Sequence, residues 1–257
     1  MRAEGYREAL VKWKAARMAH RSNKRALLAP LRVFNAAIRW LAAKTHHLET
    51  KILWRFPPQP LWHDHFSDQY WEMGARRTTH WLERGVFSRM FLKPGGSLLE
   101  LCCGDGFYAK LFFSTSAARV LAVDADIAAI NHASRFNAAP GVEYRLHDIR
   151  VGLPRGDFDN IVWDGSLAYF KEQEIRSILQ AVAAALGHNG ILSGSTVASN
   201  VATYITGQKR EIRDENELRR LLCPHFANVI IWETVHPGRT NLYFACSQQP
   251  LKQFWPH

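Results

Sequence analysis

The sequence has few cysteines and no long apolar run, and each absence excludes a class of protein. The four cysteines, Cys102, Cys103, Cys223 and Cys246, include no C-x-x-C pair, and adjacent cysteines do not easily bond each other. We therefore expect neither a disulfide scaffold nor a zinc site, and a reducing cytoplasm fits this composition best. No stretch of about 18 uncharged apolar residues occurs, so we expect no membrane span. Residues 1–20 contain no apolar core like that of a signal peptide.

The chain also has no excess of positive charge beyond its first 56 residues. Residues 1–56 contain 13 lysines and arginines against 3 acidic residues, which accounts for the whole net charge of +10. Residues 57–257 contain 20 basic and 20 acidic residues. The positive charge therefore belongs to an N-terminal arm, and net charge gives no support to a nucleic-acid cleft in the remainder.

The pattern of the arm, residues 1–56, predicts helix in two pieces. Residues 3–27 are rich in Ala, Arg, Lys and Leu, Pro30 suits the first turn of a second helix, and the run FPPQP at 56–60 marks a boundary. Three roles for the second helix stay open: packing on the remaining chain, formation of a homo-oligomer, or peripheral contact with an anionic membrane surface. Its apolar seam, at three- and four-residue steps, consists of Leu31, Phe34, Ile38, Leu41, Leu48 and Ile52.

Apolar strand patterns alternate with helical patterns from Gly96 onward. This alternation predicts an α/β fold with a doubly wound, mostly parallel seven-stranded sheet covered on both faces. Only PGRT, residues 237–240, separates the last two strands, so we expect a C-terminal antiparallel hairpin. Residues 57–95 are expected to form a helical cap or lid before the main domain, residues 96–257. The predicted strands are 97–103, 119–125, 142–148, 158–166, 190–198, 228–236 and 241–247, with helices such as 172–186 and 214–223 between them.

The strongest local signal for function is LLELCCGDGFYAKLF at residues 98–112. An apolar strand runs into a glycine-containing turn that opens a helix, so the backbone can approach a ligand and free N–H groups face it. Twenty residues after Gly104, a second strand ends in Asp124, whose carboxylate can accept both hydroxyls of a ribose. These features fit both a nicotinamide-dependent oxidoreductase, through G-x-G-x-x-A, and an enzyme that uses S-adenosylmethionine.

Three features favour S-adenosylmethionine over NAD. Glu100 lies inside the strand, in E-x-x-x-G-x-G, where a carboxylate can order the turn and meet the cationic methionine end. Asp148 ends the third strand, well placed for the adenine amino group. The predicted C-terminal hairpin is not part of a dinucleotide-binding sheet. An NAD-dependent oxidoreductase and a cofactor-binding domain without turnover remain as alternatives.

Residues 61–250 resemble the class I S-adenosylmethionine-dependent methyltransferases, and more closely their small-molecule branch, methyltransferase type 11 or 12. ELCCGDG stands where that family has its glycine-rich motif, with Cys102 in place of the usual first glycine. VDAD, HDI and FDNIVWDGSLAYF match the ends of the second, third and fourth strands. Many relatives carry Glu-His where this chain has Ala168-Tyr169, so a role for that histidine does not carry over. The resemblance implies a Rossmann-like methyltransferase.

The resemblance also implies where the cofactor binds, and each residue has a simpler alternative role. Glu100 could only order the turn, Asp148 could cap the next element, Trp163 could belong to the core, and the adjacent cysteines could be small residues that fit a crowded turn. The predicted cofactor-binding residues are Glu100, Cys102, Gly104, Asp105, Gly106, Asp124, Ala125, Asp148, Ile149 and Trp163.

The acceptor side of the site rests on two regions, WHDHFSDQYWEMGARR before the first strand and the turn of the hairpin. Methyl transfer from a sulfonium is an in-line displacement, and a hydroxyl acceptor needs a base. We predict His65 as that base, with Asp164 as a second catalytic candidate, and no metal. The predicted substrate-binding residues are Tyr70, Arg76, Tyr169 and Arg239.

The acceptor itself is expected to be a small polar molecule or a glycan unit, methylated on oxygen or nitrogen. A methyltransferase directed at RNA or protein through the basic arm is the competing interpretation, although nucleic acid is disfavoured by the balanced charge of residues 57–257. These expectations name S-adenosylmethionine as cofactor, with the membrane or a second copy of the chain as partners of the arm.

Overall fold

The computed structural model describes residues 29–53, 73, 78–198, 209–236 and 239–251. The chain divides into two compact units, residues 1–57 and 58–257. Among the described residues, no helix is both long enough and apolar enough to cross a membrane.

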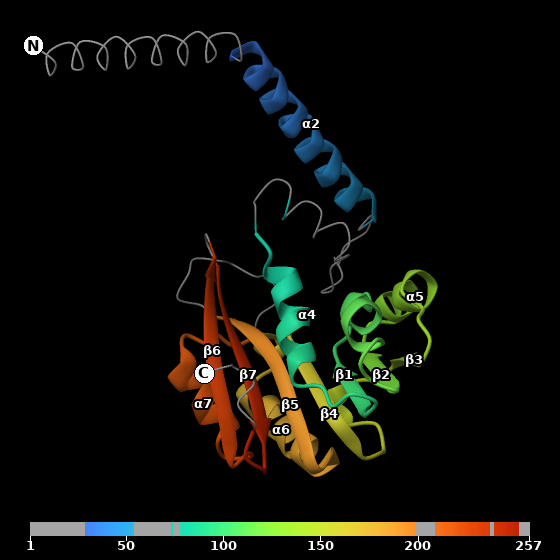
Figure 1. Cartoon of the computed structure of the whole chain (residues 1–257), viewed down its shortest axis with the longest axis vertical. Coiled ribbons are helices and arrows are strands. Elements are labelled where there is room, and N and C mark those ends of the chain that lie inside the picture. Colours follow the sequence, from blue (N-terminus) through green and yellow to red (C-terminus); the bar gives the residue numbers. More distant parts are fainter. Residues whose placement is uncertain (1–28, 54–72, 74–77, 199–208, 237–238, 252–257) are drawn as a thin grey trace, which may run out of the picture. The chain divides into compact units, whose positions relative to one another are not determined.

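The second unit is built on one seven-stranded sheet with the strand order β3-β2-β1-β4-β5-β7-β6 (Figure 1). The first five strands of the chain pair in parallel, and β7 is antiparallel to both β5 and β6. The predicted mostly parallel sheet with a C-terminal antiparallel hairpin is confirmed. The strands are β1 (Ser97–Leu101), β2 (Arg119–Asp124), β3 (Val142–Leu146), β4 (Phe158–Asp164), β5 (Leu186–Ala198), β6 (Asn228–His236) and β7 (Arg239–Ser247).

Helices cover both faces of this sheet. On one face, α6 (Glu172–Ala185) and α7 (Glu215–Leu222) bury apolar residues against alternate residues of β1 and β4, such as Leu99 and Trp163. In α6 these residues recur at three- and four-residue steps, as the amphipathic pattern requires. On the other face, the helical segment that includes η2 (Ala109–Phe113) packs on Leu98 and Val162. Because successive residues of a strand point to opposite faces, Glu100 and Asp164 lie on this second face.

Two further helices complete the second face and its margin. α4 (His80–Met90) lies in front of β4 and β5 in Figure 1, and α5 (Ile127–Phe136) lies beside β2 and β3. Asp126 begins α5 by accepting a hydrogen bond from the Ala128 N–H, as a helix N-cap does. Short 3₁₀ turns, η3 (Ile149–Val151) and η4 (Leu167–Tyr169), follow β3 and β4. The part of the predicted cap described here is therefore α4 and the turns beside it.

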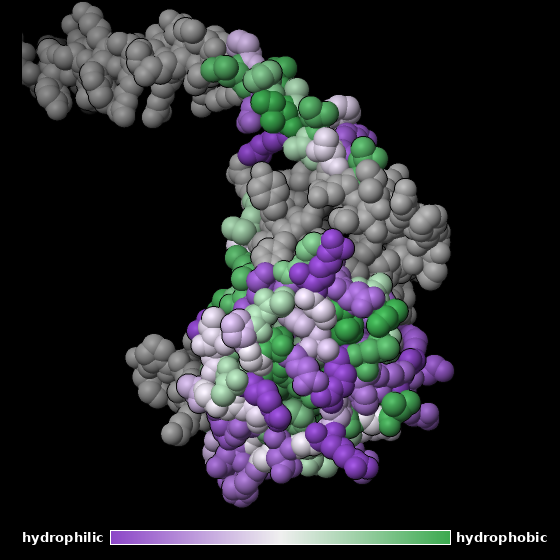
Figure 2. Space-filling view, turned by 90° about the vertical axis from the view of Figure 1, so that its right-hand side faces the viewer, coloured by the Kyte–Doolittle hydropathy of each residue, from purple (hydrophilic) through white to green (hydrophobic). Residues whose placement is uncertain are grey.

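The described part of the first unit is a single helix, α2 (Ala29–Leu53). Pro30 lies in its first turn, where proline costs the helix no hydrogen bond. The predicted first helix of the arm, residues 3–27, lies outside the described residues. Figure 2 shows several apolar side chains on the surface of α2, and five residues of the predicted seam are exposed: Leu31, Phe34, Ile38, Leu41 and Leu48.

Candidate functional site

The turn after β1 adopts a left-handed backbone at three positions. Cys102 has φ 57°, Gly104 has φ 55° and Gly106 has φ 76°. Among the described residues, Cys102 is the only non-glycine with a positive φ. The family motif that this turn resembles has a glycine at that position, so the cysteine occupies a conformation that usually needs glycine. Burial and the charge of Asp124 raise the pKa of the Cys102 thiol to about 12, which favours an unreactive thiol.

Asp124 fixes the turn from the end of β2. Its Oδ2 accepts a hydrogen bond of 2.9 Å from the Gly104 N–H, and its Oδ1 accepts one of 2.9 Å from the Asp126 N–H. Burial raises the pKa of the Asp124 carboxyl, although these backbone N–H groups oppose the shift. Ala125, the next residue, is exposed. The predicted ribose-binding carboxylate is therefore held against the glycine turn, with one N–H on each oxygen.

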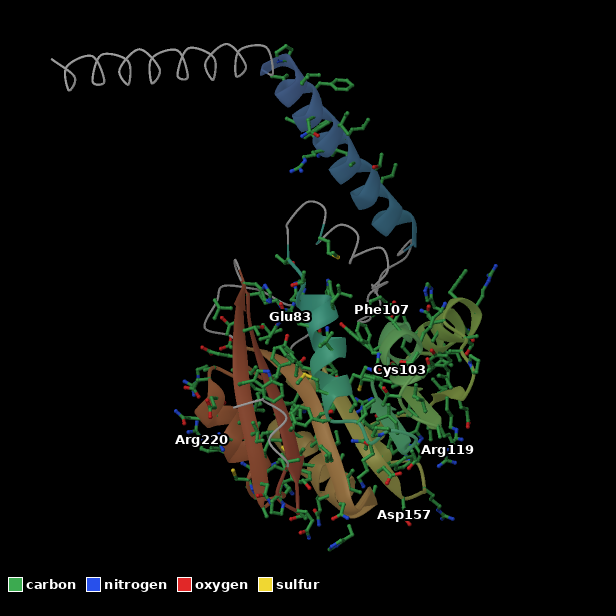
Figure 3. All side chains as sticks on the ribbon, in the orientation of Figure 1. Glu83, Cys103, Phe107, Arg119, Asp157 and Arg220 are labelled. Carbon is green, nitrogen blue, oxygen red and sulfur yellow. The ribbon has the colours of Figure 1, made fainter. Side chains whose placement is uncertain are left out.

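Hydrogen bonds from Asn137 and Tyr144 also hold the turn in place. The Asn137 side-chain amide donates to the backbone oxygen of Asp105 at 2.5 Å, and the Tyr144 hydroxyl donates to the backbone oxygen of Asn137 at 2.8 Å. Tyr144 also packs against Gly106 so closely that a Cβ there would lie 2.6 Å from its hydroxyl oxygen. Cys103 and Phe107, both labelled in Figure 3, belong to one buried hydrophobic cluster. The glycine at 106 is therefore required by both its φ and its neighbour.

Glu100 lies beneath the turn as a buried carboxyl with an unsatisfied oxygen. The residue is 2% exposed, and its Oε2 is buried with no hydrogen-bond partner. Burial, and then the charges of Asp164 and Asp105, raise its pKa well above the ordinary value. Because a buried polar atom without a partner is costly, this oxygen is suited to meet a polar or cationic ligand group at the turn.

The other predicted cofactor residues lie at the ends of β3 and β4. Asp148 forms the N-cap of η3, and both its oxygens accept hydrogen bonds from the Arg150 guanidinium at 2.6–3.0 Å. These bonds lower the pKa of Asp148. Ile149 is buried behind it. Trp163 has no exposed surface and its indole N–H donates to Ser166 Oγ at 2.9 Å, which favours its alternative role as a core residue.

Asp164, which ends β4, forms a buried ion pair that no local sequence pattern predicts. Its Oδ2 accepts a 2.8 Å hydrogen bond from Nε of Arg84 on α4, and its Oδ1 accepts a hydrogen bond from the Ser195 hydroxyl. The side chains of Arg84 and Asp164 are 8% and 4% exposed. Burial opposes the charge on Arg84, but the attraction of Asp164 outweighs it and raises the pKa of the guanidinium above its ordinary value.

Aromatic rings and a glycine shape the position of Arg84. Its guanidinium carbon lies 5.0 Å from the ring centroid of Trp81 and 5.0 Å from that of Tyr108. A Cβ on Gly165 would lie 2.1 Å from one of its nitrogens, so only glycine leaves room for it. Contacts of this kind between guanidinium and aromatic faces stabilise a desolvated cation.

Arg239, the first residue of β7, enters the same cluster. Its guanidinium carbon lies 5.4 Å from the Trp81 ring centroid, and its Nε donates to Asn241 Oδ1 at 2.6 Å. Burial, and then the positive charge of Arg84, lower its pKa to about 10. Arg239 is half-buried at the start of this strand. Tyr169 is half-buried, and burial raises its pKa against the opposing charges of Arg84 and Arg239.

A carboxylate–imidazole pair closes the upper end of α4. Glu83, labelled there in Figure 3, accepts hydrogen bonds at its Oε2 from Thr234 at 3.0 Å and lies 2.9 Å from His236 Nε2. Its Oε1 accepts a hydrogen bond from Thr79 at 3.0 Å. This pair ties α4 to the β6–β7 hairpin.

The structure thus brings together part of the predicted site. Asp164, Tyr169 and Arg239 share one region, and the glycine turn, Glu100 and Asp124 share another. His65, Tyr70 and Arg76 lie outside the described residues. Sequence reasoning missed Arg84, Glu83 and Ser195, because an isolated arginine, glutamate or serine in an amphipathic segment carries no local signal of its partner.

Comparison with known proteins identifies the fold. Residues 98–190 match the family model described as a methyltransferase domain. The solved DhpI–SAH complex has 22% identity and a TM-score of 0.57, covering 72% of this chain and 92% of its own. N-methyltransferase NodS from Bradyrhizobium japonicum, in complex with S-adenosylhomocysteine, has 17% identity and a TM-score of 0.55, covering 68% and 90%. A putative S-adenosylmethionine-dependent methyltransferase from Listeria monocytogenes has 16% identity and a TM-score of 0.52, covering 66% and 100%. No curated protein matches significantly.

Proposed function

We propose that this chain transfers a methyl group from S-adenosylmethionine to a small polar acceptor, because residues 98–190 match a methyltransferase domain model and the fold is similar to that of solved methyltransferases. The acceptor is a small molecule or a glycan unit, methylated on oxygen or nitrogen. One observation carries the proposal. The unsatisfied oxygen of buried Glu100 lies beneath a left-handed glycine turn that Asp124 fixes from the next strand.

The residues present fit this cofactor. Gly104 and Gly106 carry no side chains that would keep a ligand from the backbone at these two positions. Asp124 keeps free lone pairs for ribose hydroxyls, since each of its oxygens accepts one backbone hydrogen bond. Glu100 provides an acceptor for the cationic methionine end, and Asp148 one for the adenine amino group. When bound, S-adenosylmethionine supplies a methyl group already activated on its sulfonium.

We assign Asp164 a positioning role in place of the role of a general base. Both its oxygens already accept hydrogen bonds, one from a buried guanidinium and one from Ser195. These two bonds hold the Asp164 carboxylate in one position at the end of β4. Asp164 instead fixes Arg84 and the wall of the acceptor side. His65 stays the predicted base for a hydroxyl acceptor.

Calorimetry with S-adenosylhomocysteine and NAD tests the cofactor assignment. We expect S-adenosylhomocysteine to bind and NAD not to bind. Asp124→Ala should weaken binding by about 1–3 kcal/mol, the scale of lost hydrogen bonds to a charged group, and Gly104→Val should abolish it. Asp157→Ala, an exposed carboxylate at the opposite end of the sheet (Figure 3), is the control and should change nothing. Tight NAD binding without any response to S-adenosylhomocysteine would overturn the proposal.

A second proposal concerns the arm. We propose that α2 lies on an anionic membrane surface, because it exposes apolar residues such as Phe34, Trp40 and Leu41 in a segment that holds the whole net charge. In sedimentation with anionic and with neutral vesicles, the full chain should leave the supernatant only when the vesicles are anionic. A chain starting at Pro57 should stay in solution with both. Equal behaviour of the two chains contradicts the proposal, and loss of a dimer or of RNA binding on truncation would point to the other partners.

A further inference from the structure

Arg84 and Arg239 both contact the ring of Trp81. Together with Asp164 and Tyr108, these residues form the cluster at the end of β4. The guanidinium carbons of Arg84 and Arg239 lie 5.0 and 5.4 Å from the centroid of the Trp81 ring. Arg84 has a carboxylate partner, Asp164, at 2.8 Å. Among the described residues, no carboxylate pairs with Arg239, and its one hydrogen bond goes to the neutral side chain of Asn241.

The charge of Arg239 is therefore poorly compensated by the protein itself. Its pKa falls to about 10, first because the side chain is buried and next because Arg84 repels it, whereas Tyr108, Tyr243 and Asp164 offset only part of both effects. Arg84 has the opposite balance, since Asp164 raises its pKa. Of the two arginines, Arg84 therefore has a carboxylate paired with it and Arg239 has none among the described residues.

The strand register places Arg239 where a ligand of this sheet binds. Thr240 pairs with Ala198, so β7 begins beside the carboxyl end of β5. Asp164 pairs with Ser195, and Ser195 pairs with Tyr243, two residues from Asn241 and four from Arg239 on the same face of β7. Ligands of open α/β sheets bind outside the carboxyl ends of the parallel strands. Arg239 as a whole residue is half-buried.

From this arrangement we propose that Arg239 binds an anionic group, a carboxylate or a phosphoryl group, on the methyl acceptor. The guanidinium offers a planar, fixed set of donors that matches such groups. Trp81 holds its plane and Asn241 its Nε, which leaves the terminal nitrogens to bind the anion. The inference rests on the proposed methyltransferase function and narrows its acceptor to an anionic small molecule.

The first test measures anion binding without turnover. The full chain, saturated with S-adenosylhomocysteine, is titrated with inorganic phosphate and separately with acetate at constant ionic strength, and the thermal midpoint is followed. We expect the thermal midpoint to rise in a saturable way with at least one anion. In Arg239→Gln the apparent affinity for that anion should be at least tenfold weaker. Arg220→Gln, an exposed arginine on α7 in Figure 3, is the matched control and should bind as the unaltered chain does. The anion that gives the larger rise distinguishes a phosphoryl from a carboxylate acceptor.

A second measurement distinguishes ligand binding from a purely structural role. If the role of Arg239 is to bind an anion, Arg239→Gln should be at least as stable as the unaltered chain when no anion is present. The reason is that the substitution removes an uncompensated cation. A clear loss of stability in that variant, with anion binding unchanged, would overturn the inference. Failure of S-adenosylhomocysteine to bind any of these chains would instead contradict the proposed function, whatever the anions do.

Discussion

Arg84 and Asp164 lie 80 positions apart in the sequence, yet their side chains meet at 2.8 Å in an ion pair that is almost completely buried. The pair joins α4 to the end of β4, on the side of the site that we propose for the methyl acceptor. Buried ion pairs contribute little net stability, but removing one partner leaves an uncompensated charge. This bond therefore fixes the position of α4 more than it stabilises the fold.

Asp164→Ala should cost about 3–5 kcal/mol of unfolding free energy, because Arg84 would stay buried without its partner. Arg84→Met combined with Asp164→Leu should cost less than Asp164→Ala alone, since neither charge of the pair then remains buried. Urea denaturation followed by circular dichroism measures both. Glu143→Ala, which breaks the exposed pair with Arg145, is the control and should cost about 0–1 kcal/mol. An Asp164→Ala variant as stable as this control would contradict the prediction.

Cys102→Gly should stabilise the protein by up to about 1 kcal/mol, because it relieves a left-handed backbone at a residue with a Cβ. The greater freedom of glycine in the unfolded chain reduces that gain. Cys103→Gly is the matched control: the neighbouring cysteine is buried and has no positive φ, so its loss should destabilise. Thermal or urea unfolding compares the two. A loss of stability in both variants would mean that the Cys102 thiol is needed for packing.

These contacts show what sequence could and could not predict. The glycine turn, Asp124 and the ends of β2 and β4 follow from local patterns, in which strand, turn and carboxylate are close in the chain. The Arg84–Asp164 pair depends on where α4 lies on the sheet, which no spacing records. Trp163 and Asp164 are neighbours in one motif, yet strand alternation sends one into the core and the other to the cluster. The sequence analysis named both residues as site candidates but did not predict which face of the sheet each side chain occupies.

Gly106→Ala should reduce cofactor affinity as well as stability, because a side chain there meets a neighbour in addition to adopting a positive φ. Its Cβ would lie 2.6 Å from the Tyr144 hydroxyl, in addition to the strain of φ 76°. Gly95→Ala is the matched control, since Gly95 has φ 71° but no atom within 4 Å of an added Cβ. Both variants should lose about 1 kcal/mol from backbone strain. Only Gly106→Ala should also lose at least about tenfold in affinity for S-adenosylhomocysteine in calorimetry, roughly 1.4 kcal/mol. Equal affinity of both variants would contradict the assigned position of the cofactor.

The Glu83–His236 contact predicts a specific dependence of stability on pH. Burial alone would raise the pKa of Glu83, but hydrogen bonds involving His236, Thr234 and Thr79 outweigh it and hold the pKa below its ordinary value of 4.5. A carboxyl whose pKa is depressed by folding contributes stability above its unfolded pKa and loses it as pH falls through the folded pKa. The contribution should therefore be complete above about pH 5 and disappear in more acidic solution.

Glu83→Gln isolates this contribution. Because the side chain is partly exposed, we expect the difference in unfolding free energy between the unaltered chain and the variant to be at most about 1 kcal/mol near neutral pH. That difference should shrink toward zero as the pH is lowered past 4.5, the ordinary value for the group. Asp157→Ala, which removes an exposed carboxylate at the other end of the sheet, corrects for general acid effects and should show no such change. A difference that stays constant from neutral to acidic pH would show that Glu83 holds the hairpin by packing, not by its charge.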